Sequence, residues 1–516
     1  MVSEQIRLAE LMAALSVGVD LSMGDSAEHA QRSAVVAVAL AEAAGLSEQE
    51  AQDAYYLAML RTVGCTGDHD FAFRIFGEDL GWLGLAAMGS PLALLGQMAR
   101  NVGRKAGGVR RAGQVARAFA SLPEVMRNSR IHCEVGTMLS QRLGLGPGVV
   151  AGLGQVFERW DGMGAPHKLR GEAIARPVRV AQLASDIETA ARTLGLDAAR
   201  DLLRPRAGQG HDPQLVALFC ARPGGFVDRL DRGSIWQTVV DAEPGPRVLL
   251  GGERLDLALR SAGELADMKS DFTRGHSAAV AALTEAACEG LGLADAEVRA
   301  AHRAGHLHDL GRVGVFAYVW DKPGPLSDAE WERVRMHSYY TERVLSRLGA
   351  LGSVCAIAGL AHERRDGSGY HRRLSSPNLS AAARVLAAAD VYQALTSARP
   401  QRAALSADAA AAQLRNEGVG GKLDPEAVEA VLAAAGHGGQ ARRRGGSART
   451  ALTAREIAVL RLLARGLTNK EIAQALDISS KTAGHHVEHI FSKAHVTTRA
   501  AAALYAMQND LLADEV

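Results

Sequence analysis

The chain has 516 residues, a formal net charge of +1 and 47% hydrophobic residues, but only 4% aromatic residues. This length allows several domains, and the alanine-rich helical patterns with few aromatic residues argue against a sheet-dominated fold, so we predict an all-α protein. The five scattered cysteines indicate neither a disulfide framework nor a zinc cluster. We also expect a cytoplasmic protein without a membrane segment, because the longest apolar stretch, residues 34–45, is short and the N-terminus has no export signal.

The N-terminal region, residues 1–240, carries a spacing that recurs in the second half of the chain. In the first half, Arg61 follows His29 by 32 positions, and in the second half His308 follows His276 by the same interval. Likewise, Phe157 follows His132 by 25 positions, as His362 follows His337. The first copy has Arg61, Thr62 and Phe157 where the second has histidine or aspartate. We therefore predict two tandem helical bundles, of which the first cannot form the same metal centre and has a packing or sensory role.

The second region, residues 241–438, contains a possible metal centre. His308 stands directly before Asp309 in the segment from His306 to Gly314. Imidazole and carboxylate ligands together suit a divalent ion such as iron, manganese or zinc, provided that the fold brings in further ligands. Six residues of suitable type are spread over positions 276–390, and they are His276, His308, Asp309, His337, His362 and Asp390. We predict that they hold one or two divalent ions.

The segments around these residues resemble the HD-GYP family, a branch of the HD phosphohydrolases, from about Glu264 to Gly436. The matching segments are residues 270–277, the His-Asp-Leu-Gly-Arg motif at 308–312, and residues 321–328, 366–370 and 389–396. The resemblance implies an all-helical bundle that holds metal, with cyclic di-GMP as the usual substrate.

The resemblance also implies a role for each matching residue. His276, His308, Asp309 and Asp390 would form one metal site, and Asp309 would bridge to a second site held by His337 and His362. Hydrolysis of an anionic phosphodiester needs a cation on its oxygens and an acidified water. Asp309 and Arg312 would be catalytic, with Arg312 in place of the family's lysine as a fork for a phosphate. The substrate would contact Arg312, Arg364, Asp366, Gly369 and Tyr370.

Three positions depart from the family pattern. Ala361 stands where the family has the first of two histidines, which removes a ligand from the second metal site. Arg365 replaces a tryptophan, and His371 replaces the proline of the Gly-Tyr-Pro sequence. Hydrolysis of another phosphoester with a single metal therefore stays open, as does a catalytically inactive domain that only senses a ligand.

A Gly/Arg-rich linker, residues 439–450, leads to a C-terminal domain, residues 451–516. Thr453 with Glu456 and Thr468 with Glu471 each have the spacing of a capping box, so each pair predicts the start of a helix. A turn at residues 477–479 is followed by a third helix that begins near Ser480 and runs toward Lys493. This order predicts a helix-turn-helix.

The C-terminal domain resembles the four-helix LuxR-type DNA-binding domain over residues 452–512. Segments 453–456, 466–473, 478–482, 486–493 and 496–500 match. The resemblance implies double-stranded DNA as partner, a third helix that enters the major groove, and a homodimer that reads paired half-sites. The expected DNA contacts are Lys470, Ser480, Lys481, Thr482, His485, His486 and Lys493.

The charge distribution agrees with nucleic-acid binding by the C-terminal domain. Residues 441–516 contain 11 Lys or Arg and 7 Asp or Glu, and an excess of positive charge favours phosphate contacts. We therefore predict a LuxR-type transcriptional regulator coupled to a metal-dependent HD-GYP-like phosphohydrolase. The alternative is a regulator whose HD-GYP-like region is inactive and senses a cyclic dinucleotide or another phosphoester.

Overall fold

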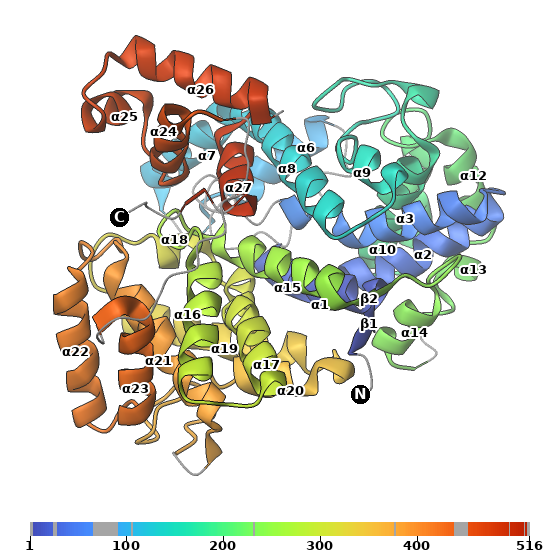
Figure 1. Ribbon diagram of the computed structural model, residues 1–516. Helices are drawn as coiled ribbons and strands as arrows, with labels where there is room; N and C mark the ends of the chain where they lie inside the picture. Colours follow the sequence, from blue (N-terminus) through green and yellow to red (C-terminus); the bar gives the residue numbers. More distant parts are fainter. Residues whose placement is uncertain are drawn as a thin grey trace. The chain divides into compact units, whose positions relative to one another are not determined.

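The computed structural model describes residues 4–23, 28–64, 91–104, 107–230, 233–375, 378–437, 452–494, 496–509 and 511–512. The predicted all-α fold is confirmed, since the described residues form helices joined by loops, with a single two-stranded sheet of β1 (Gln5–Arg7) and β2 (Leu249–Gly251) (Figure 1). The predicted linker, residues 439–450, lies outside the described residues.

The chain divides into two compact units, which we call the N-terminal unit (residues 7–250) and the C-terminal unit (residues 251–516 with the segment up to Ile6). The helices of the N-terminal unit are α1 (Leu8–Met23), α2 (His29–Ala43), α3 (Glu48–Leu60), α6 (Pro91–Asn101), α7 (Gly108–Ala120), α8 (Leu122–Arg142), α9 (Pro147–Leu153), η2 (Gly171–Ala173), α10 (Arg176–Leu194), α11 (Leu196–Leu203), η3 (Arg204–Arg206), α12 (Pro213–Ala221), α13 (Gly224–Val227) and α14 (Ile235–Asp241).

The C-terminal unit contains a larger bundle followed by four further helices. The bundle comprises α15 (Gly252–Asp267), α16 (His276–Gly290), α17 (Asp295–Leu307), η4 (Leu310–Gly314), α18 (Ala317–Trp320), α19 (Asp328–Leu345), η5 (Gly349–Leu351), α20 (Gly352–Ala358), α21 (Ala381–Thr396), α22 (Ala407–Val419), α23 (Pro425–Leu432) and η7 (Ala433–His437). The last four helices are α24 (Ala454–Ala464), α25 (Asn469–Ala475), α26 (Ser480–Ala494) and α27 (Arg499–Gln508).

Each unit has a core of three packed helices. In the N-terminal unit α2, α3 and α10 pack against one another, and in the C-terminal unit α16 packs against α17 and α21. Small residues allow the helices to approach closely. A Cβ atom at Gly305 of α17 would lie 2.5 Å from Cα of Ala281 in α16, so this crossing requires glycine. Helix α21 is rich in alanine and buried on most sides, as expected for a central helix.

The tandem repeat is visible in hydrogen bonds that recur in the two units. Asp267 accepts a hydrogen bond from the backbone N–H of Ser277 at 2.9 Å, and Asp20 accepts one from that of Ala30 at 3.0 Å. Glu363 accepts hydrogen bonds from the backbone N–H groups of Arg372 and Leu374, and at the matching place Glu158 accepts them from those of His167 and Leu169. The pair Arg384–Asp424 in the C-terminal unit likewise corresponds to Arg179–Asp212 in the N-terminal unit. The first copy therefore keeps the scaffold of the second.

Helices α24 to α27 form the predicted helix-turn-helix domain. Both capping boxes are present: Thr453 with Glu456 starts α24, and Thr468 with Glu471 starts α25. The turn before α26 contains Asp477 with a φ of 51°, a left-handed conformation that aspartate tolerates. Helix α24 packs against α27, and α25 packs against α26.

Among the described helices of the chain, we find none that is both long enough and apolar enough to cross a membrane.

Candidate metal centre and DNA-binding helix

His308 and Asp309 lie at the point where helix α17 ends. His308 is the C-cap residue of α17, and the tighter helical turn η4 begins one residue after Asp309. Nδ1 of His308 donates a hydrogen bond to the carbonyl oxygen of Gly305 at 2.8 Å, which leaves Nε2 as the atom that can bind a cation. The turn η4 packs against α19, and Gly311 permits this because a Cβ there would lie 1.9 Å from the carbonyl oxygen of His337.

A first group of ligand atoms comes from helices α16, α17 and α21. Ligand atoms of His276, His308 and Asp390 all lie within 4.8 Å of one another, and the three residues are buried. Nε2 of His276 lies 3.2 Å from Oδ1 of Asp390, and Nε2 of His308 lies 3.7 Å from the same oxygen. His276 is the first residue of α16 and follows Gly275, whose φ of 78° turns the chain into the helix.

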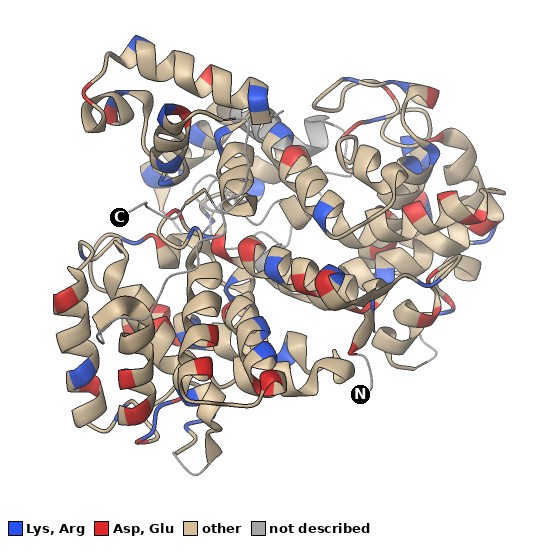
Figure 2. Cartoon of the chain, in the orientation of Figure 1, with Lys and Arg blue, Asp and Glu red and all other residues tan. Residues whose placement is uncertain are grey.

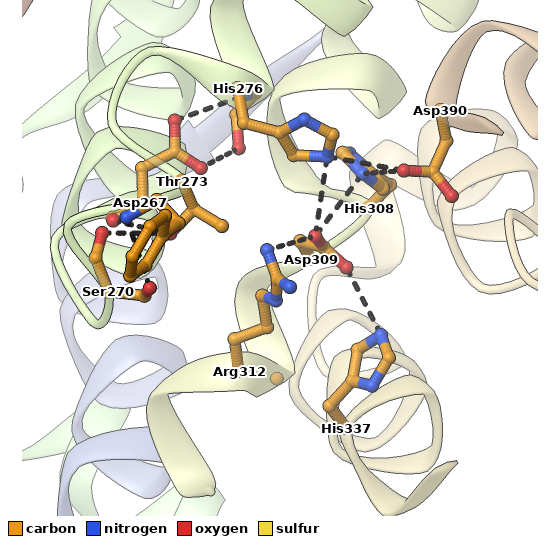
Figure 3. Close-up of polar contacts among 12 residues, drawn as sticks. Asp267, Ser270, Thr273, His276, His308, Asp309, Arg312, His337 and Asp390 are labelled. Atoms are coloured by element: carbon orange, nitrogen blue, oxygen red, sulfur yellow. Dashed lines mark hydrogen bonds and ion pairs between the residues drawn. The ribbon is translucent and has the colours of Figure 1, made fainter. Parts of the chain in front are cut away.

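A second group consists of Asp309, His337 and His362, which also meet within 4.8 Å. Oδ1 of Asp309 lies 3.1 Å from Nε2 of His337 and 3.0 Å from Nε2 of His362. Its other oxygen, Oδ2, lies 3.6 Å from Nε2 of His276 and 3.5 Å from Nε2 of His308. Asp309 therefore stands between the two groups, as Figure 3 shows.

The charges of the site favour a cation. Burial acts to raise the pKa of Asp309, but Arg312 and His308 outweigh it and hold that pKa well below its usual range. Burial is likewise outweighed at Asp390, whose pKa is held low by His276 and His308. Both carboxylates are therefore ionised near neutral pH.

The imidazoles of the site differ in charge. Burial lowers the pKa of both His276 and His362 to about 4, so these rings are neutral and can bind a metal. At His308 the carboxylates of Asp309 and Asp390 outweigh burial and raise the pKa to about 9. Metal binding at Nε2 of His308 would therefore displace a proton.

The donor set fits a divalent transition metal. Four imidazoles and two carboxylates are a combination that suits iron, manganese or zinc. Within the described chain, Nε2 of His276 and Nε2 of His308 are buried and make no hydrogen bond. Buried polar atoms are normally satisfied, so two unsatisfied nitrogens that face carboxylates indicate a site built for an ion. The six residues expected from the sequence are thus brought together.

Five of the six candidate ligands, all except His308, line a cavity of 320 Å³ with a strongly basic wall. Its four arginines are Arg312, Arg364, Arg399 and Arg402. The guanidinium of Arg312 lies 3.0 Å from Oδ2 of Asp309 and 4.2 Å from the centre of the Trp320 ring, so it is held between an anion and an aromatic face. The cavity therefore combines a candidate metal site with groups that bind phosphate.

Two of these arginines were not predicted from the sequence as site residues. Arg399 and Arg402 belong to the Arg-Pro-Gln-Arg segment that follows helix α21, nine residues after Asp390. Burial, followed by the nearby Arg312, lowers the pKa of Arg399 to about 10, and the side chain still carries its charge near neutral pH. The position of these residues directly after the last ligand helix was the available signal.

The predicted substrate loop contributes unequally to the cavity. Arg364 and Tyr370 line it, and the Tyr370 ring stacks on His362 with ring centres 5.1 Å apart. Asp366 is exposed and accepts a hydrogen bond from the N–H of Ser368, and neither Asp366 nor Gly369 is among the lining residues. A Cβ at Gly369 would lie 2.5 Å from the backbone of Glu363. The glycine thus serves the shape of the loop.

His371, which replaces the family's proline, ties this loop to helix α19. Its Nε2 lies 2.6 Å from Oε2 of Glu342, and its Nδ1 lies 3.0 Å from Oγ of Ser338. The departure from the family pattern is therefore accommodated by two polar contacts, and the adjacent Tyr370 is held over the metal ligands.

The same place in the N-terminal unit has different chemistry. Nη1 of Arg61 donates a hydrogen bond to Oγ of Ser185 at 2.8 Å, and Ser185 follows Phe157 by the interval that separates Asp390 from His362. His29 pairs with Glu188 at 2.5 Å. Among the described residues of this unit, no cluster of three metal-binding side chains occurs.

Helix α26 presents the residues expected to meet DNA. Ser480, Lys481, Thr482 and His485 are exposed and His486 is partly exposed, while Lys470 is exposed on α25. Basic residues lie toward each end of α26 (Figure 2). Lys493 differs from the others because its Nζ forms an ion pair with Oε2 of the buried Glu456 at 2.7 Å.

The comparisons with known proteins match both parts of the C-terminal unit. A family model for the HD domain matches residues 260–427, and one for bacterial regulatory proteins of the luxR family matches residues 450–506. A 3′3′-cGAMP-specific phosphodiesterase of Vibrio cholerae is 29% identical over 438 residues, which cover 82% of this chain and 94% of that protein. That similarity is longer than either unit of this chain.

A further relative and a solved structure are also similar to this chain. A cyclic di-GMP phosphodiesterase of Pseudomonas aeruginosa is 38% identical over 167 residues, which cover 32% of this chain and 40% of that protein. The crystal structure of a cyclic GMP-AMP specific phosphodiesterase of V. cholerae superposes with a TM-score of 0.58 and 27% identity, covering 84% of this chain and 98% of the other.

Proposed function

Because the chain carries an HD domain followed by a LuxR-type helix-turn-helix domain, we propose that it is a metal-dependent phosphodiesterase for cyclic dinucleotides whose state controls DNA binding. The observation that carries the proposal is the position of Asp309 between two ligand groups in a cavity with four arginines. The names of the similar phosphodiesterases, which act on 3′3′-cGAMP or cyclic di-GMP, suggest the substrate class.

The reaction would hydrolyse one phosphodiester bond. A water oxygen forms a new bond to phosphorus, the bond from phosphorus to a ribose oxygen breaks, and that oxygen takes up a proton, which leaves a phosphomonoester and a hydroxyl group. Metal bound by the six ligands would polarise the phosphate and acidify the water. Arg312, Arg364, Arg399 and Arg402 would hold the phosphate oxygens by charge-assisted hydrogen bonds.

A hydrolysis assay and elemental analysis test this function together. We expect purified protein to contain iron, manganese or zinc and to convert cyclic di-GMP or 3′3′-cGAMP into a linear dinucleotide. Arg399→Gln should raise KM, while Arg372→Gln, which alters a half-exposed arginine outside the cavity, should not. Protein that contains metal but hydrolyses no phosphodiester would refute the enzymatic proposal.

A ligand sensor without catalysis is the second candidate, and Ala361 favours it. This residue is fully buried directly before His362 and cannot supply the histidine that the family pattern has there. The second group thus has three protein ligands. Binding of cyclic di-GMP without turnover, even in the presence of metal, would favour the sensor.

For the helix-turn-helix domain we propose that α26 enters the major groove of double-stranded DNA and that the protein binds as a homodimer to paired half-sites. The exposed side chains of its first two turns support this role. Selection from random duplexes with the full chain, followed by light scattering of the complex, tests both statements. Failure to enrich any sequence would contradict specific recognition.

Contacts within the C-terminal unit suggest how the two activities are coupled. The loop before His276 contains Arg274, whose Nη1 donates a hydrogen bond to the carbonyl oxygen of Ala464 in α24 at 2.6 Å. On α15, Arg260 donates a hydrogen bond to the carbonyl oxygen of Met507 in α27 at 3.1 Å. A change at His276 therefore has a short path to the DNA-binding domain, and we expect the affinity for DNA to differ between metal-loaded and metal-free protein.

A further inference from the structure

A second cavity adjoins the metal cavity on the side of helix α19. It has a volume of 420 Å³ and is lined by Asp328, Trp331, Glu332, Arg335 and Tyr370. Trp331 and Tyr370 also line the metal cavity. The two cavities therefore adjoin at these two aromatic residues. All of the residues that line the second cavity, except Tyr370, belong to the first part of α19.

The metal cavity is small for a ligand of the size of a cyclic dinucleotide. At 320 Å³ it lies at the lower end of the ~300–1,000 Å³ range of pockets that enclose a drug-sized ligand. A cyclic dinucleotide carries two purines, two riboses and two phosphates. If one phosphate meets the metal ligands and arginines, part of the molecule must extend into adjoining space, and the second cavity offers that space.

Trp331 is suited to hold a base in the second cavity. Its side chain is 43% exposed at the start of α19, an unusual degree of exposure for a tryptophan. Within the described chain its ring has no stacking partner, whereas Trp320 is already covered by Arg312 at 4.2 Å. An exposed indole face binds any nucleobase by stacking.

The charged residues of the second cavity favour guanine over adenine. Glu332 is paired with Arg335 at 2.5 Å, while Asp328 is exposed and has no ion-pair partner among the described residues. An ionised carboxylate accepts hydrogen bonds only. The Watson–Crick edge of guanine has two adjacent donors, N1–H and the N2 amino group, which fit a carboxylate. Adenine has one donor beside an acceptor, and that acceptor would face the carboxylate.

We propose that the second cavity is a base subsite in which a guanine of the cyclic dinucleotide stacks on Trp331 and donates hydrogen bonds to Asp328. This inference rests on the proposed phosphodiesterase function and assigns the recognition of one guanine to Trp331 and Asp328. Tyr370, which stacks on His362, lines both the metal cavity and the base subsite.

The test compares a dinucleotide with a small diester in the full-length protein. Hydrolysis of cyclic di-GMP, cyclic di-AMP and bis(p-nitrophenyl) phosphate is measured for Trp331→Ala, Trp331→Phe and Asp328→Asn. Met336→Ala is the control, since Met336 is an exposed apolar residue of α19 (37%) outside both cavities. Binding of cyclic di-GMP to metal-free protein is measured by equilibrium dialysis, which gives a readout independent of activity.

We expect Trp331→Ala to raise KM and Kd for cyclic di-GMP by roughly 5- to 150-fold, the range set by base stacking on an aromatic ring. Hydrolysis of bis(p-nitrophenyl) phosphate should stay within about twofold of the unmodified protein, a change near the limit of additive behaviour. Trp331→Phe should restore most of the binding. Asp328→Asn should bring the preference for cyclic di-GMP over cyclic di-AMP close to one.

Three results would overturn the base subsite. The first is an unchanged Kd for cyclic di-GMP in Trp331→Ala. The second is an equal loss of activity on cyclic di-GMP and on bis(p-nitrophenyl) phosphate, which would mean that Trp331 has a structural role. The third is hydrolysis of the small diester by a protein that neither binds nor cleaves any cyclic dinucleotide, which leaves the phosphohydrolase but removes the subsite. If the unmodified protein hydrolysed none of the substrates but bound cyclic di-GMP in a way that depends on Trp331, the proposed hydrolase function would be refuted. The proposed base subsite would still stand.

Discussion

Replacement of Asp309 by asparagine is the sharpest test of the metal centre. Oδ1 of Asp309 lies 3.0–3.1 Å from the histidines of the second group, and Oδ2 lies 3.5–3.6 Å from those of the first. Asp309→Asn keeps the shape of the side chain and removes the negative charge from both groups. Asp390→Asn makes the same chemical change at a member of the first group, whose Oδ2 lies 3.5 Å from Nδ1 of a single histidine of the second group, His362.

The structure sets the expected magnitudes. Loss of a supporting residue around a metal ligand lowers metal affinity by ~10–100-fold, and loss of a ligand carboxylate should cost at least as much. Asp309→Asn also leaves the buried guanidinium of Arg312 without the carboxylate 3.0 Å away. Removal of one partner from a buried ion pair costs about 3–5 kcal/mol, so the metal-free variant should also unfold at a lower temperature.

The assay is elemental analysis of the dialysed full-length protein, supported by thermal unfolding with and without added Mn²⁺. We expect up to two ions per chain in the unmodified protein, about one in Asp390→Asn and less than half an ion in Asp309→Asn. Glu289→Gln, at an exposed carboxylate near the end of α16, is the control. If Asp309→Asn retained as much metal as Asp390→Asn while remaining folded, the bridging position of Asp309 would be refuted.

Four other outcomes are expected. His308→Ala combined with Asp309→Ala in the full chain should abolish stoichiometric metal, because Arg61 and Ser185 replace the ligands in the N-terminal unit; one ion per chain in elemental analysis would contradict this. Gly369→Ala should raise KM for a phosphodiester because the new Cβ would lie 2.5 Å from the backbone of Glu363, whereas Ser368→Ala should have little effect. Burial opposes ionisation of Glu456, but Lys493 and Thr453 outweigh it and lower its pKa to about 2; its contribution to the stability of the helix-turn-helix domain is therefore complete above about pH 4.5 and is lost as the pH falls toward 2. Glu456→Gln should abolish that pH dependence, measured by hydrogen exchange in α24, and should destabilise the domain by ~1–3 kcal/mol at pH 7. Lys481→Ala should weaken DNA binding by roughly 1–3 kcal/mol in a titration if the side chain reads a base. If the side chain meets a phosphate, the loss of affinity should be the same for all sequences and the salt dependence should be shallower. Unchanged binding at every salt concentration would exclude Lys481 from the interface.

The sequence by itself determined the helical fold and the repeat, and it named the candidate ligand set. Helical periodicity and capping boxes are local, so the starts of α24 and α25 follow from Thr453 and Thr468 and their partners three residues on. The candidate metal ligands are rare residue types at set intervals. That is why His276, His308 and Asp390 could be named before their distances were known.

The tertiary structure decided which charges meet. Arg399 and Arg402 reach the cavity because the segment after α21 lies beside the metal ligands, and no local pattern encodes that. Lys493 is a residue type that commonly contacts phosphate, yet in the folded domain it forms an ion pair with Glu456. Asp366 stands in the matching motif but faces solvent. Pairing of charges depends on distances of a few ångströms between residues far apart in the chain, and only packing of the helices sets those distances.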